Sequence, residues 1–306
     1  MSISSPTAVS EMDLDSAKRS IPWWAKIGAK IVLSRLPLRH RFWQRVRLFQ
    51  QGSMASPHYA SGVFRTHFDR VDFSSKEGGF VVLELGPGDS LSTALIARAF
   101  GAKACYMVDI FPYARTDIAP YLALEKYLRE CGLDVPNLGS FASVAEMLER
   151  CEARYETEGL KSLRNIPTAS VDFIFSHTVL QHIRLGEFVD TIAELRRILS
   201  GNGVCSHRID LRDCIGGGLN NLRFSAALWE SDFIASSGFY TNRIRFVEML
   251  NLFADAGFRA ECIAIDRWRE VPISRGKLAR QYRSRDDDEL TVSGFDVILR
   301  PVICPQ

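Results

Sequence analysis

The pattern of apolar and polar positions changes character at residues 80–94, FVVLELGPGDSLSTA. An apolar run, Phe80–Leu83, reaches an acid at Glu84 and is then broken by the Gly-Pro-Gly sequence at 86–88. From Ser90 the apolar residues recur with helical spacing. A short apolar run followed by a glycine turn and a helical pattern predicts a buried strand that turns directly into a helix.

The glycine turn at 86–88 has two properties that suit a nucleotide-like ligand. Glycine has no Cβ, so a ligand can approach the backbone closely and φ can be positive. The following helix directs its free N–H groups and the positive end of its dipole towards the same point. We therefore interpret the turn as a nucleotide-sized cradle at the end of the first strand.

Two more apolar runs follow, and each contains an acid. Residues 102–110, AKACYMVDI, include Asp109, which stands about twenty residues after the glycine turn. A carboxylate at the end of a second strand can accept hydrogen bonds from both hydroxyls of a ribose. Residues 170–183, SVDFIFSHTVLQHI, combine a strand-like run with the start of a short helix. The order of these elements predicts an α/β sheet with a ligand at its carboxyl edge.

The same two periodicities predict the remaining elements. The expected helices cover residues 118–131, 141–153, 188–199 and 247–256, and the expected strands cover residues 154–157, 203–210, 260–268 and 292–300. The route of about sixty residues from Asp109 to the fourth strand is unusually long and predicts a helical insertion at about residues 112–152. The last two strands are expected to form an antiparallel pair.

The segment Glu84-Leu85-Gly86-Pro87-Gly88-Asp89-Ser90 resembles the acid-x-G-x-G-x-G signature of the class I S-adenosylmethionine-dependent methyltransferases, with serine in place of the third glycine. Residues 170–183 resemble the fourth-strand motif of the same superfamily. The resemblance covers about residues 78–301. It implies a Rossmann-like sheet of seven mostly parallel strands with an antiparallel last strand and helices on both faces. It also implies methyl transfer, with S-adenosylmethionine as the cofactor.

The resemblance further implies which residues bind the cofactor. The segment after the third strand lies where this family places its contacts to the adenine edge. The expected cofactor-binding residues are Glu84, Gly86, Pro87, Gly88, Asp89, Ser90, Asp109, Ile110, Glu158, Gly159, Ser176 and His177.

The chain before the first strand divides into two parts. Residues 1–20 are polar, Ser-rich and aperiodic, and are expected to be disordered. Residues 21–77 are expected to form a helical extension in front of the methyltransferase domain at 78–306. Within this extension, residues 21–52 show two basic amphipathic helical patterns. They fit helices packed on the domain with Lys and Arg reaching water, which we favour, or a surface for an anionic membrane.

Candidate catalytic residues gather where the fourth and fifth strands end. His177 directly follows the fourth strand, and His207 and Asp210 lie at the end of the fifth. A carboxylate partner keeps an imidazole oriented and basic, so His207 beside Asp210 is the preferred general base. His177 is the second candidate.

Candidates for acceptor binding lie outside the strands. Arginine can bind an anionic substrate through paired hydrogen bonds, and an aromatic side chain can line a pocket. The expected substrate-binding residues are Tyr240, Arg243 and Arg245. A helix at 54–73 is expected to close over the cofactor, and its pocket-wall candidates are His58, Tyr59 and His67.

The composition limits the class of protein, the partners and the location that can be expected. Hydrophobic residues make up 46% and charged residues 24% of the chain, which is typical of a globular protein in water. The net charge of +2 lacks the basic excess of nucleic-acid binders, so no nucleic-acid partner is expected. The 7 cysteines form no C-x-x-C pair, and no metal site is expected. Reduced thiols and the absence of a secretory apolar segment predict a cytoplasmic protein, with membrane association through 21–52 as the open alternative.

Three functions remain open on the sequence alone. The first is a methyltransferase acting at oxygen on a small-molecule or sugar-containing acceptor. The second is a nicotinamide-dependent oxidoreductase or epimerase, which is disfavoured because Leu91 stands where that fingerprint needs a glycine. The third is a non-catalytic scaffold that binds S-adenosylmethionine. The oligomeric state of the protein is left open for all three.

Overall fold

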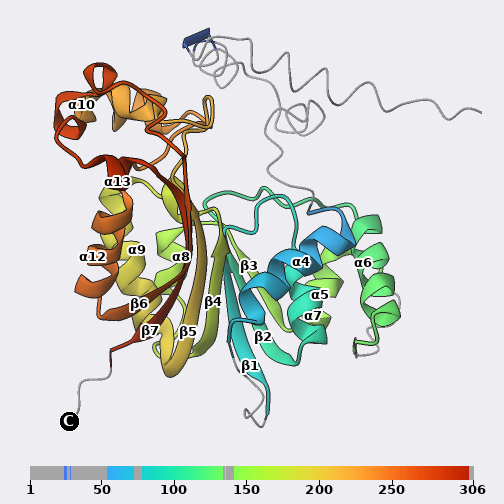
Figure 1. Cartoon of the computed structure of the whole chain (residues 1–306). Helices are drawn as coiled ribbons and strands as arrows, with labels where there is room; N and C mark the ends of the chain where they lie inside the picture. The colour runs from blue at the N-terminus through green and yellow to red at the C-terminus, as the bar shows by residue number, and fades with distance from the viewer. Residues whose placement is uncertain are drawn as a thin grey trace, which may run out of the picture.

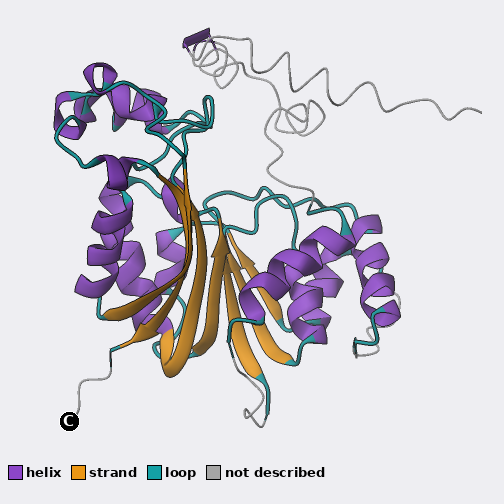
Figure 2. Ribbon diagram, viewed as in Figure 1, coloured by secondary structure: helices purple, strands orange, loops and turns teal. Residues whose placement is uncertain are grey.

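A computed structural model describes residues 24, 25, 28, 54–71, 78–133, 135 and 141–302. The predictions for the tail at 1–20 and for the basic segment at 21–52 therefore concern residues that lie outside this part of the chain, apart from positions 24, 25 and 28. In the described part, a single sheet carries helices on both of its faces (Figures 1 and 2).

The sheet has seven strands in the order β3-β2-β1-β4-β5-β7-β6. Strand β7 runs antiparallel to both of its neighbours, and the other pairs are parallel. The predicted fold class is confirmed. The strands are β1 Phe80–Leu85, β2 Ala102–Val108, β3 Ala153–Glu156, β4 Val171–His177, β5 Leu199–Asp210, β6 Phe258–Arg267 and β7 Val292–Pro301.

Helices cover the two faces of the sheet unequally. In Figure 1, α4 to α7 lie on the right face, whereas α8, α9 and α12 lie on the left face. The helices are α4 Pro57–Phe68, α5 Ser92–Ala99, α6 Ala119–Glu130, α7 Val144–Arg150, α8 Leu160–Arg164, α9 Leu185–Ile198, α10 Ala226–Trp229, α11 Asp232–Ala235, α12 Phe246–Asp255 and α13 Asp287–Leu290. Short 3-10 turns are η1 Leu180–His182, η2 Asn220–Arg223, η3 Arg275–Lys277 and η4 Arg280–Tyr282.

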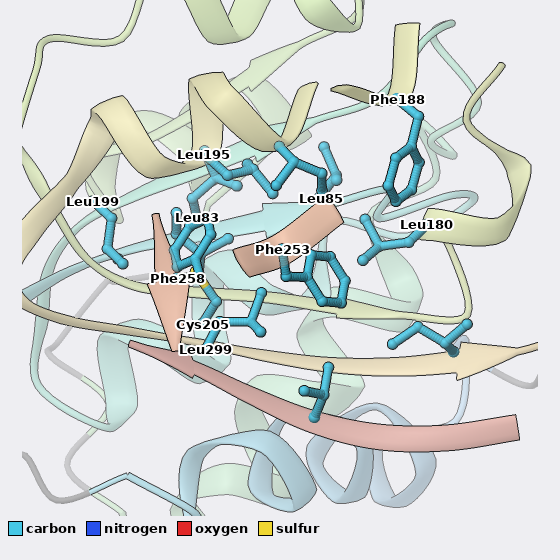
Figure 3. Packing of buried hydrophobic residues seen from close by; sticks show 14 of the residues in the cluster. Leu83, Leu85, Leu180, Phe188, Leu195, Leu199, Cys205, Phe253, Phe258 and Leu299 are labelled. Atoms are coloured by element: carbon cyan, nitrogen blue, oxygen red, sulfur yellow. The ribbon is translucent and has the colours of Figure 1, made fainter. Parts of the chain in front are cut away.

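Each face of the sheet has its own apolar core. On the left face, Leu195 of α9 and Phe253 of α12 pack with Leu83 of β1 and Leu299 of β7 (Figure 3). On the right face, α4 to α7 pack on Phe173 and neighbouring side chains. Strand β1 is buried along its whole length, which is why its sequence is apolar at every position except Glu84 rather than alternating.

The predicted elements agree with the structure except at some boundaries and in four short helices that were not predicted, α8, α10, α11 and α13. Strand β5 begins at Leu199, four residues before the prediction, because the turn residues at 200–203 are taken up by a shift in its register with β4. Helices α10 and α11 lie between β5 and α12. These helices have only four residues each, which is too short for a helical period to show in the sequence.

Residues 211–245 and 268–291 form a layer beyond the carboxyl end of β5, which we call the β5 cap (Figure 1). It has two small apolar cores of its own, one around Trp229 and one around Leu222. The carboxylate of Asp213 accepts backbone N–H bonds from residues 215, 216, 218 and 220 and so fixes the first loop of the cap. The cap therefore borders the edge of the sheet where ligands bind in this architecture.

Candidate functional site

The two glycines of the turn after β1 serve different purposes. A Cβ at Gly86 would lie 2.5 Å from a methyl group of Val179, so this position must be glycine for the turn to pack on the segment after β4. A Cβ at Gly88 would meet nothing within 4 Å, and its φ of +66° favours glycine for the backbone conformation. Open space therefore lies in front of Gly88, where the cradle was predicted.

Asp109 directly follows Val108, the last residue of β2, and ties the second strand to the glycine turn. Its carboxylate accepts a 3.0 Å hydrogen bond from the N–H of Gly88 and a 2.7 Å bond from the N–H of Ile110. Burial raises the pKa of Asp109, and these backbone bonds oppose that rise. Because each carboxylate oxygen can accept more than one hydrogen bond, the group can still accept bonds from a ligand hydroxyl.

Exposed apolar side chains stand next to Asp109. Ile110 is 71% exposed and Phe111 is 49% exposed, which is unusual for such side chains at the edge of a buried sheet. The N–H of Gly159 donates to the carbonyl of Asp109 at 2.9 Å, and a Cβ at Gly159 would lie 3.1 Å from Ile110. Glu158 is exposed and forms a 2.6 Å ion pair with Lys161. A flat apolar group would fit against this surface.

Glu84 is a carboxyl group inside the sheet. It is 4% exposed, and its Oε2 atom has no hydrogen-bond partner among the described residues. Burial raises the pKa of Glu84 to about 8, while a hydrogen bond with Thr93 lowers it and the nearby Asp109 raises it further. An unpartnered buried acid is costly, and a cationic group at this position would offset that cost.

The remaining cradle residues make local contacts. Asp89 forms a 2.6 Å ion pair with Arg115. The hydroxyl of Ser90 lies 2.7 Å from that of Ser92 and accepts from the N–H of Ser92, at the start of α5. The serine that replaces the third glycine of the signature thus bonds to the first residue of α5, whose N-cap position is Leu91. Pro87 connects the two glycines.

A histidine pair lies at the carboxyl end of β4. His177 is half-buried, and its Nδ1 is 3.1 Å from Nε2 of His67 on α4. Burial lowers the pKa of His177 below its ordinary value of 6.5, the charge of Arg208 lowers it further, and Asp296 opposes this. The sequence indicated both histidines separately, but nothing in it indicated that they touch.

The expected pair of His207 and Asp210 does not form. Residues three apart on a strand face opposite sides of the sheet, and Asp210 accepts hydrogen bonds from Arg212 instead. His207 is fully buried, its Nδ1 lies 2.8 Å from the hydroxyl of Ser176, and its Nε2 is enclosed without a partner among the described residues. Burial lowers the pKa of His207 to about 3. The prediction that His207 is the general base is therefore wrong. The buried hydroxyl of Ser176 is hydrogen-bonded to His207.

The three expected acceptor-binding residues are internal parts of the β5 cap. Arg243 donates to the carbonyl of Phe224 at 2.8 Å and pairs with Glu230 at 3.3 Å. The hydroxyl of Tyr240 donates to Glu230 at 2.6 Å. Arg245 is buried and donates to backbone carbonyls beside β5 and β7. Their assignment to substrate is corrected: the three side chains hold the cap together.

Thr178, directly after β4, is a residue that the sequence did not single out. Its φ is +59°, a conformation that is strained for a β-branched residue and occurs where the surrounding structure holds it. Its N–H donates to the carbonyl of Arg208, and its own carbonyl accepts from the side chain of Gln181 at 2.8 Å. This turn brings Val179 onto Gly86, so it shapes the site from the β4 side.

Comparison with known proteins agrees with this geometry. Residues 83–206 match the family model described as a methyltransferase domain. A search of curated protein sequences gives no match.

Solved structures with a similar fold are distant. The chain is 16% identical to an S-adenosylmethionine-dependent methyltransferase of Mesorhizobium loti, covering 80% of this chain and 100% of that one, with a TM-score of 0.43. It is 13% identical to the Burkholderia thailandensis 1,6-didemethyltoxoflavin-N1-methyltransferase, covering 98% and 94%, with a TM-score of 0.41. It is 12% identical to the CurJ carbon methyltransferase, covering 84% and 57%, with a TM-score of 0.40. Similarity at this level says nothing about the acceptor of this chain.

The methyltransferase domain matched at residues 83–206, the strand order and the glycine turn show that the chain contains an S-adenosylmethionine-dependent methyltransferase domain with a Rossmann-like fold. S-adenosylmethionine is its cofactor. The cradle residues suit this molecule chemically. The open space before Gly88 would admit the cofactor, Asp109 would bind its ribose hydroxyls, Ile110 and Phe111 would contact its adenine, and Glu84 would face its ammonium group.

Proposed function

We propose that this enzyme methylates a hydroxyl oxygen of a small-molecule or sugar-containing acceptor, with His177 as the general base. The observation that supports this proposal is a half-buried imidazole at the carboxyl end of β4, next to the glycine turn. Glu84 pairs with Phe175 across β1 and β4, so His177, two residues further along, lies beside Gly86. This places an imidazole at the edge of the cradle.

The chemistry explains why a base belongs there. When bound, S-adenosylmethionine supplies a methyl group on a sulfonium sulfur, so that attack by an acceptor oxygen forms an O–C bond, breaks the S–C bond and leaves the electron pair on sulfur. A hydroxyl has a high pKa and is a weak nucleophile unless a base takes its proton. The pKa of His177 is lowered, so its imidazole is neutral at pH 7 and can accept that proton at Nε2. An amine acceptor would not need this base.

The cofactor contacts position the methyl group for this reaction. Glu84 and Asp109 hold the polar ends of the cofactor, and the backbone of Gly86 and Gly88 lets it approach. Positioning is the main contribution of the protein to an in-line displacement, because alignment removes much of the entropic barrier. The alternative of a scaffold without catalysis would leave His177 without a role at the cradle.

The proposal also covers the location and the partners of the enzyme. The described helices include none that is long and apolar enough to cross a membrane. We propose a cytoplasmic enzyme that acts without a nucleic-acid partner. Contact with an anionic membrane through residues 21–52 remains the second proposal, because seven Lys and Arg residues of that segment accompany its apolar stripes.

Incubation with S-adenosylmethionine that carries ¹³C in its methyl group tests the proposal. The enzyme is mixed with a small-molecule extract of its source cells, and the labelled product is examined by NMR, in which methyl groups on oxygen, nitrogen and carbon differ in carbon chemical shift. We expect a methyl group on oxygen and a loss of rate of about 10²–10⁴-fold in His177→Gln, the usual contribution of a general base. Cofactor affinity measured by calorimetry should fall far less than the rate in that variant. A product methylated on nitrogen or carbon, or full activity in His177→Gln, would contradict the proposal.

A further inference from the structure

A line of hydrogen bonds runs from the sheet through α4 to the candidate base. The hydroxyl of Ser206 on β5 lies 2.8 Å from Nδ1 of His67, and Nε2 of His67 lies 3.1 Å from Nδ1 of His177. His67 is fully buried. Its ring packs on Phe175 with centroids 5.4 Å apart and meets the ring of His177 nearly at a right angle, at 86°. Both nitrogens of His67 are thus used, and its ring has no room to turn.

The protonation states of this line are limited by the burial of His67. Burial lowers the pKa of His67 well below its ordinary value, and the neighbouring His177, His207 and Arg70 lower it further. His67 therefore stays neutral and carries one proton. When His177 becomes charged, both of its nitrogens donate, so Nε2 of His67 must accept and its single proton must lie on Nδ1, pointing at Ser206.

The other charged groups around His177 come from three elements. Arg70 follows α4, Arg208 lies on β5 and Asp296 lies on β7. Asp296 pairs with Arg70 at 2.9 Å and with Arg208 at 3.6 Å, so its carboxylate is shared between two guanidinium groups. No hydrogen bond from His177 to Asp296 occurs in the described part of the chain, and the orienting contact of His177 is the one to His67.

We propose that His67 is a positioning residue of the methyl-transfer site, which accepts a hydrogen bond from Nδ1–H of His177 and so leaves Nε2 of His177 unprotonated towards the acceptor. This inference rests on the proposed role of His177 as the base. A histidine whose second nitrogen is held by a partner keeps one tautomer and one ring orientation. In many enzymes that partner is a carboxylate; here it is a neutral imidazole, itself fixed by Ser206.

The proton that His177 takes from the acceptor remains on His177. Nδ1–H of His177 then still donates to His67, so the charged state keeps the hydrogen bond that the neutral state had. No proton needs to enter the buried ring of His67. The arrangement also ties α4, which precedes the first strand, to the chemistry at the end of β4.

Nitrogen NMR of the full chain labelled with ¹⁵N-histidine tests the inference without any acceptor, because the two tautomers of a neutral imidazole have different ¹⁵N shifts. His177 signals are assigned from His177→Gln. We expect the Nδ1–H form in the unmodified enzyme at pH 8. His67→Phe keeps a ring against Phe175 but offers no acceptor, and should move His177 to the Nε2–H form. His67→Gln, whose amide oxygen can accept, should restore part of the Nδ1–H form.

Ser206→Ala provides an independent test should His67→Phe fail to fold. Without the hydroxyl, Nδ1–H of His67 has no acceptor among the described residues, so the proton of His67 should move to Nε2 and push His177 into the Nε2–H form. The methylation rate should fall about 10- to 100-fold in His67→Phe and in Ser206→Ala, the usual effect of removing the hydrogen-bond partner of a functional histidine. Thr66→Ala, at the neighbouring exposed position of α4, is the matched control and should change neither readout.

Two outcomes would overturn the inference. One is the Nε2–H form of His177 in the unmodified enzyme. The other is an unchanged Nδ1–H form of His177 in Ser206→Ala and, where it folds, in His67→Phe. Failure of the proposed function is recognised separately. If His177→Gln methylates at the full rate while the tautomers respond as expected, the hydrogen-bond line is present but His177 is not the base.

Discussion

Replacing Glu84 with glutamine removes an acid that the fold buries without a full set of partners. Glutamine has nearly the same size and keeps a hydrogen-bonding side chain, so the change isolates the charge. In the folded protein the pKa of Glu84 is raised from 4.5 to about 8, mainly by burial. Between these two pH values the folded state holds a proton that the unfolded chain has released.

The sign of the effect follows from this difference in bound protons. Stability falls with rising pH wherever the folded state binds more protons than the unfolded state. The contribution of Glu84 is therefore harmless below pH 4.5 and becomes increasingly destabilising up to pH 8. At about 1.4 kcal/mol for each pKa unit, the interval corresponds to a loss of at most about 5 kcal/mol. Glu84→Gln should lack this loss and should gain stability over the unmodified enzyme as the pH rises.

Urea denaturation without cofactor at several pH values between 4.5 and 8.5 measures this effect. The free energy of unfolding should fall more steeply with pH in the unmodified enzyme than in Glu84→Gln. The exposed Glu187→Gln on α9 is the matched control and should retain the slope of the unmodified enzyme. Parallel pH profiles for Glu84→Gln and the unmodified enzyme would refute the reasoning, because they would mean that the carboxyl group ionises in the folded state at its ordinary pKa.

Cofactor binding gives a second measurement on the same group. If the ammonium group of S-adenosylmethionine faces Glu84, binding should ionise the carboxyl group and release close to one proton at pH 7. Calorimetry in buffers of different ionisation enthalpy counts that proton. Glu84→Gln should release none and should bind the cofactor more weakly. Equal proton release in both proteins would place the ammonium group elsewhere.

The remaining predictions concern the cradle and the basic segment. Asp109→Ala should weaken cofactor binding by about 1–3 kcal/mol, the scale of a lost hydrogen bond to a charged group, and unchanged affinity in calorimetry would end its assignment to the ribose. Gly86→Ala should destabilise the fold by about 1–3 kcal/mol, because the new methyl group would overlap Val179; Gly88→Ala, which faces open space, should reduce cofactor affinity more than stability. If residues 21–52 bind membranes, salt-sensitive sedimentation with anionic liposomes should be lost on truncating residues 1–52; sedimentation that survives truncation would contradict that proposal.

The local sequence determined most of the fold. A parallel strand buried on both faces is mainly apolar, so β1 and β4 were recognisable as mainly apolar runs in which Glu84 and Asp172 stand out. The amphipathic α9 and α12 were recognisable from their helical period. The cradle was recognisable too, because a glycine turn between a strand and a helix depends on neighbouring residues. The short helices of the β5 cap were not, since a single turn shows no period.

The tertiary structure alone decided which side chains face the site. His207 looked like a base next to Asp210, yet the alternation of β5 sends the two to opposite faces and encloses His207 beside Ser176. In the sequence, Arg243 and Arg245 looked available to bind an anion. In the structure, their guanidinium groups donate hydrogen bonds to backbone carbonyls of distant segments.

The contact between His67 and His177 is a second example of a side-chain interaction that the sequence could not reveal. The two residues are 110 positions apart, and their 3.1 Å contact exists because α4 packs across the end of β4. Elements and turns depend on nearby residues, so the sequence by itself determined the strands, the main helices and the cofactor cradle. Burial, charge and hydrogen-bond partners depend on segments that meet only in the folded chain, so only the tertiary structure brought His67 against His177 and enclosed His207 in the sheet.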